Sequence, residues 1–389
     1  MKKVLILTAG FGEGHNAAAR NLAAAIEASA GPGSAPVVDL FALASPRLNR
    51  VSRRGYLALI NRAPRVWSRF YGWIDRRDIF PRHLWFLRRE LGAFAECLRR
   101  EQPMAVCSAY PVYGFLANRL AAGGGLRVPY YHVVTDSISI NTLWTKPACA
   151  GWFVPNEETA GVMRRMGVPP EKLHAYGFPV QAFFAEHEGR LSPPDLAAGA
   201  RPRVLFIVHS GVRHAETTAR RLLAETDWEL TIAVGRDEGL RRRLAHAASG
   251  RRVSTTLLGW TDQVPRLLMT HHVVISKAGG ATTQEAIAAH CPMVVNQIVP
   301  GQEEGNFELL RRRDAGALAE TPDAVLDALR RAFADGGARC RHWSESMRTL
   351  ARRDAAPRIA AHVLCGQPIT PAEVPEPAAM FSQSPSFHG

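Results

Sequence analysis

The sequence predicts an α/β protein made of two doubly wound, Rossmann-like domains in series, with the ligand bound between them. Short apolar runs suited to strands buried on both faces alternate with helical patterns, and this alternation occurs twice along the chain. A stretch rich in Pro, Ser and Ala at 192–202 separates the two halves. The 389 residues suit two domains of ordinary size.

The apolar periodicity places each element. In the first half we expect strands at 2–8, 36–40, 105–108, 130–135 and 151–154, and helices at 15–27, 115–122 and 157–166. In the second half we expect strands at 204–208, 230–234, 254–258, 273–276 and 293–296, and helices at 215–225, 239–248, 324–334 and 343–364. We assign the domains to 1–190 and 203–340, followed by a helix at 341–365 and a disordered tail at 366–389, where Pro, Ser and Ala leave little to pack.

Composition and charge indicate the class of protein, its compartment and the kind of partner it binds. Hydrophobic content of 47% and charged content of 21% are typical of a soluble globular protein, and no apolar run is long enough to cross a membrane. Six cysteines without a C-x-x-C pair argue against a zinc site or a disulfide framework, so we expect a cytoplasmic protein. Residues 1–190 carry +10 of the net charge of +13, which predicts an anionic partner, either nucleic acid or a lipid surface.

Most of that charge lies in the segment from Arg47 to Arg100. It holds 14 arginines against four acids, interleaved with aromatic residues that include Trp67 and Trp73. This composition is typical of an interfacial segment, and basic residues near an anionic membrane contribute about 1 kcal/mol each. The alternative is a solvated basic face with the aromatics in the core, which we favour for Trp85 taken singly. No nucleic-acid-binding motif accompanies the charge, so we expect an anionic membrane surface and no nucleic acid.

The stretch 273–306 predicts an anion site. A buried strand leads into a turn at 277–280, and Thr282 stands where the N-cap of a helix belongs, with Glu285 in the first turn. The glycines of the turn let a phosphate approach the backbone, and the helix N-terminus attracts negative charge. A carboxylate there would repel the phosphate unless it faced uncharged groups such as ribose hydroxyls.

A polar loop follows the next strand. Its amides and carboxylates lie at the carboxyl edge of the sheet and can bind hydroxyls, which indicates a sugar. The loop residues concerned are Gln302, Glu303 and Asn306. A plain βαβ unit followed by a polar loop remains the alternative.

The loop at 8–16 is rich in glycine and precedes His15. With Asp39 at the end of the next strand, it imitates a dinucleotide fingerprint, but its third glycine, Gly14, comes one residue too early. A histidine at a helix start loses basicity and stays neutral near pH 7, which suits a general base. A purely structural histidine is the alternative.

Two motifs, SKAGGATTQEA from Ser276 and PGQEEGN from Pro300, carry a family resemblance. They resemble the nucleotide-sugar-binding segment of the monogalactosyldiacylglycerol synthase and processive diacylglycerol glucosyltransferase family, which is glycosyltransferase family 28-like. The resemblance implies the two-Rossmann GT-B fold, in which the last helix returns to the first domain. It also implies a UDP-hexose donor, a lipid acceptor such as diacylglycerol, and a position for His15 between donor and acceptor.

The candidate residues fall into two groups around the catalytic candidate His15. The donor or nucleotide group is Gly12, Gly14, Ser210, Gly211, Gly259, Trp260, Lys277, Gly279, Gly280, Thr282, Glu285, Gln302, Glu303 and Asn306. The acceptor or membrane group is Tyr110, Pro111, Asp136, Trp144, Trp67 and Trp73. By the resemblance, Trp144 follows a Thr-Asp pair on the acceptor side and meets lipid, although Asn141 and Thr142 replace the His-Pro of the plant-type members. Asp136 is alternatively a helix cap.

These observations predict an inverting hexosyltransferase at the cytoplasmic face of the membrane, attached peripherally. No Asp-x-Asp pair occurs, so we expect no metal and no other cofactor. Because the loop at 209–212 is poor in glycine, donor binding is expected to be weaker or altered. Two alternatives remain open: transfer to another lipid-linked sugar, or nucleotide binding without catalysis.

Overall fold

The computed structural model describes residues 2–46, 55, 84–209, 214–301 and 303–365. Some residues for which the sequence makes predictions lie outside the described ranges. They are Trp67, Trp73, Ser210, Gly211, Gln302, most of the basic segment, and the tail at 366–389.

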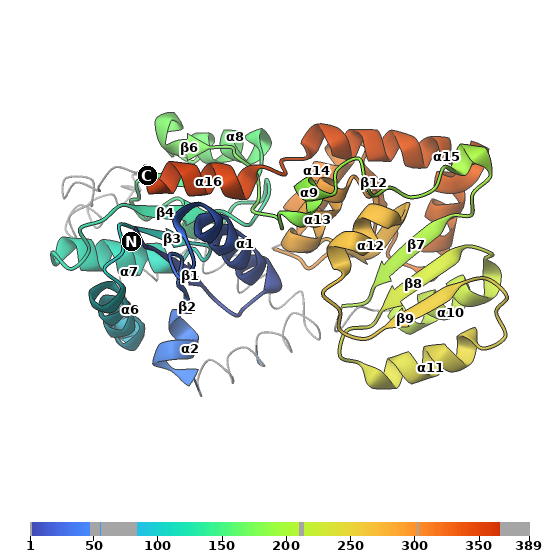
Figure 1. Cartoon of the computed structure of the whole chain (residues 1–389), viewed down its shortest axis with the longest axis horizontal. Coiled ribbons are helices and arrows are strands. Elements are labelled where there is room, and N and C mark those ends of the chain that lie inside the picture. Colours follow the sequence, from blue (N-terminus) through green and yellow to red (C-terminus); the bar gives the residue numbers. More distant parts are fainter. Residues whose placement is uncertain (1, 47–54, 56–83, 210–213, 302, 366–389) are drawn as a thin grey trace, which may run out of the picture.

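Two parallel six-stranded sheets form the molecule and lie side by side (Figure 1). The first has the order β2-β1-β3-β4-β5-β6. Its strands are β1 (Val4–Thr8), β2 (Val37–Asp39), β3 (Ala105–Ser108), β4 (Tyr130–Val133), β5 (Gly151–Phe153) and β6 (Leu173–His174). The second has the order β12-β11-β10-β7-β8-β9. Its strands are β7 (Arg203–Ile207), β8 (Glu229–Ala233), β9 (Thr255–Leu258), β10 (Val273–Lys277), β11 (Met293–Gln297) and β12 (Gly316–Leu318).

Helices connect the strands of each sheet. Those of the first domain are α1 (Glu13–Ala30), α2 (Leu40–Ala44), η1 (Leu84–Leu87), α6 (Arg88–Glu101), α7 (Tyr113–Ala122), η2 (Thr142–Trp144), α8 (Glu157–Arg165) and η3 (Pro170–Lys172). Next come α9 (Phe183–Glu186), η4 (Leu196–Ala198), α10 (Ala215–Glu225), α11 (Glu238–Ala248), α12 (Val264–Thr270), α13 (Gly280–Ala289), α14 (Glu304–Arg312), α15 (Pro322–Leu350) and α16 (Ala355–Leu364). This alternation of parallel strands and helices confirms the predicted fold class.

The central strands are buried because helices cover both faces of each sheet. Every residue of β1 is buried, and the inner residues of β10 are buried as well. On α1 the apolar stripe of Leu22, Ala23 and Ile26 faces the core. Two sheets each buried on both faces leave mainly the carboxyl edges of the strands to bind ligands.

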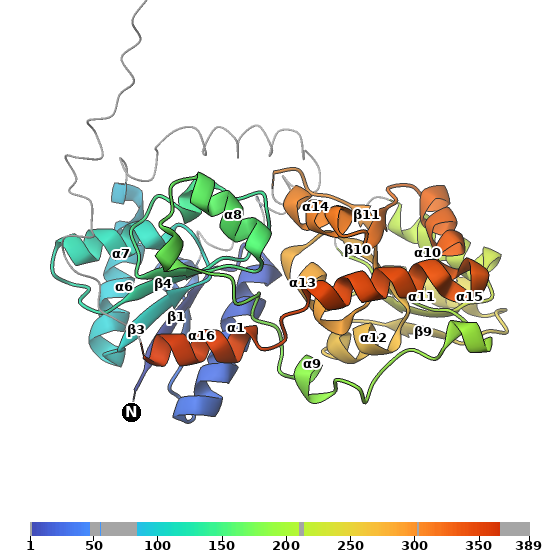
Figure 2. The same ribbon diagram turned by 90° about the horizontal axis from the view of Figure 1, so that it is seen from above.

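The C-terminal helix returns to the first domain, as the resemblance implied. α15 ends in the second domain and α16 lies beside α1 (Figure 2). Ile359, Ala360 and Val363 of α16 are fully buried in a core that includes Val4 and Ile6 of β1. α15 is broken by a kink at Ala334–Gly337, and its second part continues to Leu350 in the second domain. The chain therefore crosses to the first domain at 351–354, and not near 341 where we placed the boundary.

Three boundaries near the cleft differ from the expectations. α1 begins at Glu13, two residues before His15. α13 begins at Gly280, so Glu285 lies in the second turn. A helix, α14, begins at Glu304, where a loop was expected. In the described ranges no helix has the length and apolar character that spanning a membrane requires.

Candidate functional site

The carboxyl ends of the two sheets meet at one place between the domains. The segment after β4 contacts the first turns of α13 and α14, and α1 packs against α13. A methyl group added at Gly280 would lie 3.0 Å from the carbonyl oxygen of Thr135, and one added at Gly14 would lie 3.8 Å from the amide nitrogen of Ala281. The start of α13, where the predicted phosphate site lies, and the loop that carries His15 therefore share one interdomain site.

His15 lies in the first turn of α1, after the N-cap Gly12. Its Nδ1 is 3.0 Å from the hydroxyl oxygen of Thr135. Burial lowers the pKa of the imidazole to about 4, against the smaller raising effect of a hydrogen bond with the backbone of Ala109. The ring is therefore neutral at pH 7 and can accept a proton.

Internal hydrogen bonds hold the loop before His15. The hydroxyl of Thr8 donates to the side-chain oxygen of Asn16 at 2.9 Å. The carboxylate of Asp39 accepts from the backbone N–H of Gly10 at 2.9 Å and, through its other oxygen, from that of Ala42 at 2.9 Å. Asp39 thus anchors the loop and caps α2, which removes the ribose-binding acid on which the dinucleotide alternative depended.

The donor side is formed by the start of α13. Gly279 is its N-cap in an extended conformation, with no side chain capping the helix. The expectation that Thr282 caps this helix is therefore wrong: it lies inside the first turn. Without a capping side chain, the first N–H groups of α13 remain open to a ligand at the positive end of the helix dipole.

Glu285 lies on α13 close to α1. Burial raises the pKa of its carboxyl to about 7, while the charge of Arg20 on α1 acts in the opposite direction. Among the described residues no hydrogen-bond donor is assigned to this carboxyl. It is free to bind hydroxyl groups.

The loop after β11 is fixed by one ion pair. Lys277 at the end of β10 pairs with Glu303, and the second carboxylate oxygen of Glu303 accepts from the backbone N–H of Val299 at 2.9 Å. Both oxygens are used within the protein and the residue is buried. Glu303 thus holds the loop in place, and its predicted contact with the sugar stays a prediction.

Asn306 is buried in the first turn of α14. Its amide nitrogen donates to the carbonyl oxygen of Ala278 at 2.9 Å. Its side-chain oxygen is also buried and has no hydrogen-bond partner among the described residues. Since an unpaired buried oxygen is costly, a bound hydroxyl would stabilise this site.

On the acceptor side, Asp136 and Trp144 form a buried pair. The indole N–H of Trp144 donates to the Asp136 carboxylate at 2.7 Å, and the Trp144 carbonyl accepts from Trp152 at 2.6 Å. Trp144 is 0% exposed, so the expectation that it meets lipid is wrong. Burial raises the pKa of Asp136 to about 6, opposed by the indole hydrogen bond. Asn141, and not Asp136, caps the short helix η2.

Aromatic rings cluster beside His15. Tyr110 lies edge-on to the imidazole with ring centroids 5.2 Å apart, and it stacks on Phe11 at 6.0 Å. Phe41 contacts both rings edge-on. Pro111 follows Tyr110 at the same sheet edge. This apolar wall suits a lipid acceptor more than a polar one.

The remaining predicted residues lie farther out. Gly259 and Trp260 follow β9, and Trp260 is 70% exposed. Trp85 is 72% exposed, which corrects our assignment of this residue to the core. His271 and His272 form separate hydrogen bonds, with the hydroxyl of Thr231 and the carbonyl oxygen of Pro194, so both are structural as expected.

The fold brings to this site several residues that the sequence did not single out, and also Thr135, which was noted only as part of the Thr-Asp pair. Thr135, Ser137, Gln284 and Gly305 join the two domains, and Arg20 approaches Glu285. No local pattern marks them, because their roles depend on the way the two domains pack. Only the position of Thr135 and Ser137 after a strand end was a signal.

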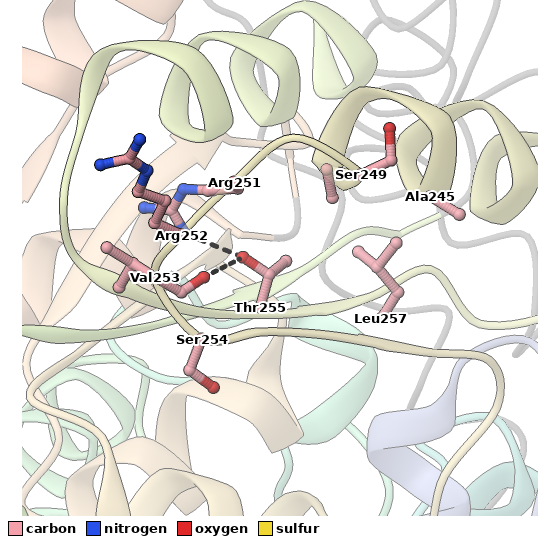
Figure 3. A pocket seen from close by; sticks show the side chains of 9 residues that line it. Ala245, Ser249, Arg251, Arg252, Val253, Ser254, Thr255 and Leu257 are labelled. Atoms are coloured by element: carbon pink, nitrogen blue, oxygen red, sulfur yellow. Dashed lines mark hydrogen bonds between the residues drawn. The ribbon is translucent and has the colours of Figure 1, made fainter.

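A hollow of about 480 Å³ lies away from this site, between the end of α11 and the amino-terminal end of β9, where Arg251 donates to Thr255 (Figure 3). Ligands of such sheets bind at the carboxyl ends of strands, so this hollow does not suit the donor. No group of three or more His, Cys, Asp or Glu side chains in the described ranges is arranged to hold a metal ion.

Two six-stranded parallel sheets in series, with their carboxyl edges facing each other, define the GT-B fold. Solved structures with this architecture include S. aureus MnaA with UDP, at a TM-score of 0.60 and 13% identity, covering 93% of this chain and 96% of that chain. MurG of Acinetobacter baumannii matches at a TM-score of 0.60 and 14% identity, covering 93% of this chain and 99% of that one. At such identities these likenesses establish the fold alone.

More particularly, residues 15–180 match the family model of monogalactosyldiacylglycerol (MGDG) synthase. The whole chain is similar to a processive diacylglycerol beta-glucosyltransferase of Bacillus cereus, with 24% identity over 391 residues that cover 98% of each chain. These matches confirm the resemblance that the two motifs indicated.

The pKa of Glu285 leads to a testable pH dependence. Because its carboxyl has a folded-state pKa of about 7 against an ordinary 4.5, the folded state retains a proton that the unfolded state loses between these values. Ionisation of Glu285 therefore lowers stability as pH rises through this window. We expect the melting temperature of Glu285→Gln, relative to the unmutated protein, to increase from pH 4.5 to 7.

The control is Glu320→Gln, because the Glu320 side chain is exposed. Its melting-temperature difference should stay constant over the same range. A constant difference for Glu285→Gln as well would contradict a buried, proton-binding carboxyl on α13.

Proposed function

We propose that this protein transfers a hexose from a UDP-sugar to the hydroxyl of a lipid, with inversion at the anomeric carbon. The acceptor that we propose is diacylglycerol. The observation that carries the proposal is the position of neutral His15, which lies between the open N-terminus of α13 and the aromatic wall of Phe11, Phe41 and Tyr110. A base between an anion site and an apolar wall suits an acceptor that is a lipid and a donor that is a nucleotide-sugar.

In the proposed reaction His15 takes the proton of the acceptor hydroxyl. The acceptor oxygen forms a bond to the anomeric carbon while the bond from that carbon to the diphosphate oxygen breaks on the opposite face. UDP leaves with the electron pair, and inversion follows from the single displacement. A diphosphate nearby stabilises the imidazolium, which offsets the effect of burial on the pKa of His15.

The donor would be held mainly by α13 and α14. The open N–H groups of the first turn of α13, from Gly280 to Thr282, would bind the diphosphate, whose charge the helix dipole favours. The Glu285 carboxyl suits the ribose hydroxyls, and the unpaired oxygen of Asn306 suits a sugar hydroxyl. Gly259 and the backbone of Trp260 would face the uracil, and no metal would be needed.

Support for a lipid acceptor comes from the relatives and from the surface of the first domain. The similar Bacillus protein is named for glucosyl transfer to diacylglycerol. In the first domain Leu43 of α2 is exposed, and so are Trp85 and Phe86 of η1, which leads into α6 with its exposed Arg88 and Arg89. α2 packs against α6. Exposed aromatics bordered by arginines suit an anionic membrane surface, and the cytoplasmic face carries such lipids.

Replacing His15 tests the proposed base. We expect His15→Gln to lower kcat by 10²- to 10⁴-fold while UDP-sugar binding remains, because general-base catalysis contributes about that much. Radiolabelled UDP-glucose and UDP-galactose, offered with diacylglycerol in mixed vesicles, give the rate and the labelled product. His246→Gln, an exposed histidine on α11, is the matched control and should retain full activity.

Each outcome of this assay has a meaning. Label in a glycosyl-diacylglycerol supports the proposal, label in a different sugar-lipid identifies another acceptor, and binding of the donor without product contradicts catalysis. Near-normal turnover by His15→Gln would show that another group is the base.

The exposed aromatics test membrane attachment. We expect the double substitution Trp85→Ala and Phe86→Ala to weaken sedimentation with anionic vesicles at low salt by about tenfold or more, since burying one such ring contributes about 1.5–3 kcal/mol. Trp260→Ala is the matched control, because Trp260 is equally exposed in the other domain. Equal loss in both variants, or loss in neither, would contradict a membrane surface at α2 and η1.

A further inference from the structure

The five residues Thr135–Ser139, which we call the bridging turn, connect the two halves of the site. On the acceptor side the Thr135 hydroxyl is 3.0 Å from Nδ1 of His15, and the backbone N–H of Ile138 donates to the Thr159 hydroxyl at 3.0 Å. On the donor side the side-chain amide of Gln284 in α13 donates to the Ser137 hydroxyl at 3.2 Å. One short segment thus touches both the candidate base and the donor helix.

Backbone packing brings the turn even closer to the donor domain. A methyl group added at Gly305 would lie 1.8 Å from the carbonyl oxygen of Ser137 and 2.5 Å from the backbone nitrogen of Ser139. Gly305 lies in the first turn of α14, so the need for glycine here arises from space and not from backbone conformation. Any side chain at 305 would push the two domains apart at the bridging turn.

The bridging turn is also strained. Ile138 has a φ of +58°, in the left-handed region that a β-branched side chain strongly disfavours. The N–H of Ser139 donates to the carbonyl of Ser137 at 2.6 Å, which closes a very tight turn. Such strain persists only where neighbouring contacts enforce it. The contacts with Gln284 and at Gly305 come from the other domain, so separating the domains would let the turn relax.

Relaxation of the turn would reach His15 through Thr135. This residue is buried, with its hydroxyl on Nδ1 of His15 and its carbonyl facing Gly280. A shift of the turn therefore moves the group that fixes the orientation of the imidazole ring. A displacement of about 1 Å in a positioning group can lower a rate about 10²-fold.

We propose that the bridging turn is an interdomain positioning element: docking of α13 and α14 on Ser137 and Ser139 sets Thr135, and Thr135 orients His15 for proton transfer. His15 is then competent only when the donor side has closed on the acceptor side. This inference rests on the proposed transfer reaction, in which His15 is the base. It assigns positioning roles to Thr135, Ser137 and Gly305, which do not touch the reacting atoms.

The test uses Gly305→Ala, with Gly92→Ala as the matched control. Gly92 lies in α6 with nothing near the position of an added methyl group, so the control should behave as the unmutated protein. For Gly305→Ala we expect kcat to fall 10- to 100-fold while KM for the UDP-sugar changes less than threefold. With saturating UDP, small-angle X-ray scattering should give a larger radius of gyration than for the unmutated protein.

Two further variants examine the link to His15. Thr135→Val should lower kcat and move the His15 pKa, followed by NMR of ¹³C-labelled histidine with UDP bound, and Thr135→Ser should restore both. If Gly305→Ala does not fold, Gln284→Leu replaces it in the test, because this variant keeps the glycine. Gln284→Leu should show the same effects on kcat and on the radius of gyration in a milder form.

These readouts separate the inference from the proposed reaction. If no transfer is found, scattering and NMR still report whether the turn links closure to His15. Unmutated kcat and compactness in Gly305→Ala, or a His15 resonance unaffected by Thr135→Val, would overturn the inference.

Discussion

The close backbone contact between the turn after β4 and the first turns of α13 and α14 is the constraint on which the site depends. Glycine at 280 and 305 leaves the space for this approach, and Thr135 and Ser137 fill it from the other domain. In the proposed reaction the second domain supplies the anion site and the first domain supplies the apolar wall. Only the contact between the domains puts His15 beside both, so the proposed chemistry depends on their interface.

Local sequence predicted much of the second domain because its signals are local. The apolar runs of β10 and β11 and the two glycines between them suffice to predict a strand, a turn and a helix with an open N-terminus. The error at Thr282 has a simple cause: a hydroxyl residue is a better cap than glycine, but Gly279 adopts the capping conformation with no side chain at all. Because no side chain caps α13, the backbone N–H groups of its first turn remain available to a ligand.

Side-chain pairing across the fold was not predictable from the sequence. The sequence did not indicate that Lys277, 26 residues earlier, pairs with Glu303. Trp144 was predicted to meet lipid, but it is buried in the core of the first domain and its indole donates to Asp136. Trp85 was the reverse case, since an aromatic residue among arginines is usually in the core, and here it is exposed. Each outcome depends on which elements become neighbours, and no spacing in the sequence encodes it.

The most direct test of the central claim, that both domains enclose a nucleotide-sugar at this contact, is hydrogen exchange of the intact protein with and without UDP. Bound UDP should slow exchange of the amides at 279–283 in the start of α13 and of those at 135–139 in the bridging turn together. The amides at 245–257, around the hollow beside β9, should not change. Protection at 245–257 with none at 279–283 would contradict the claim.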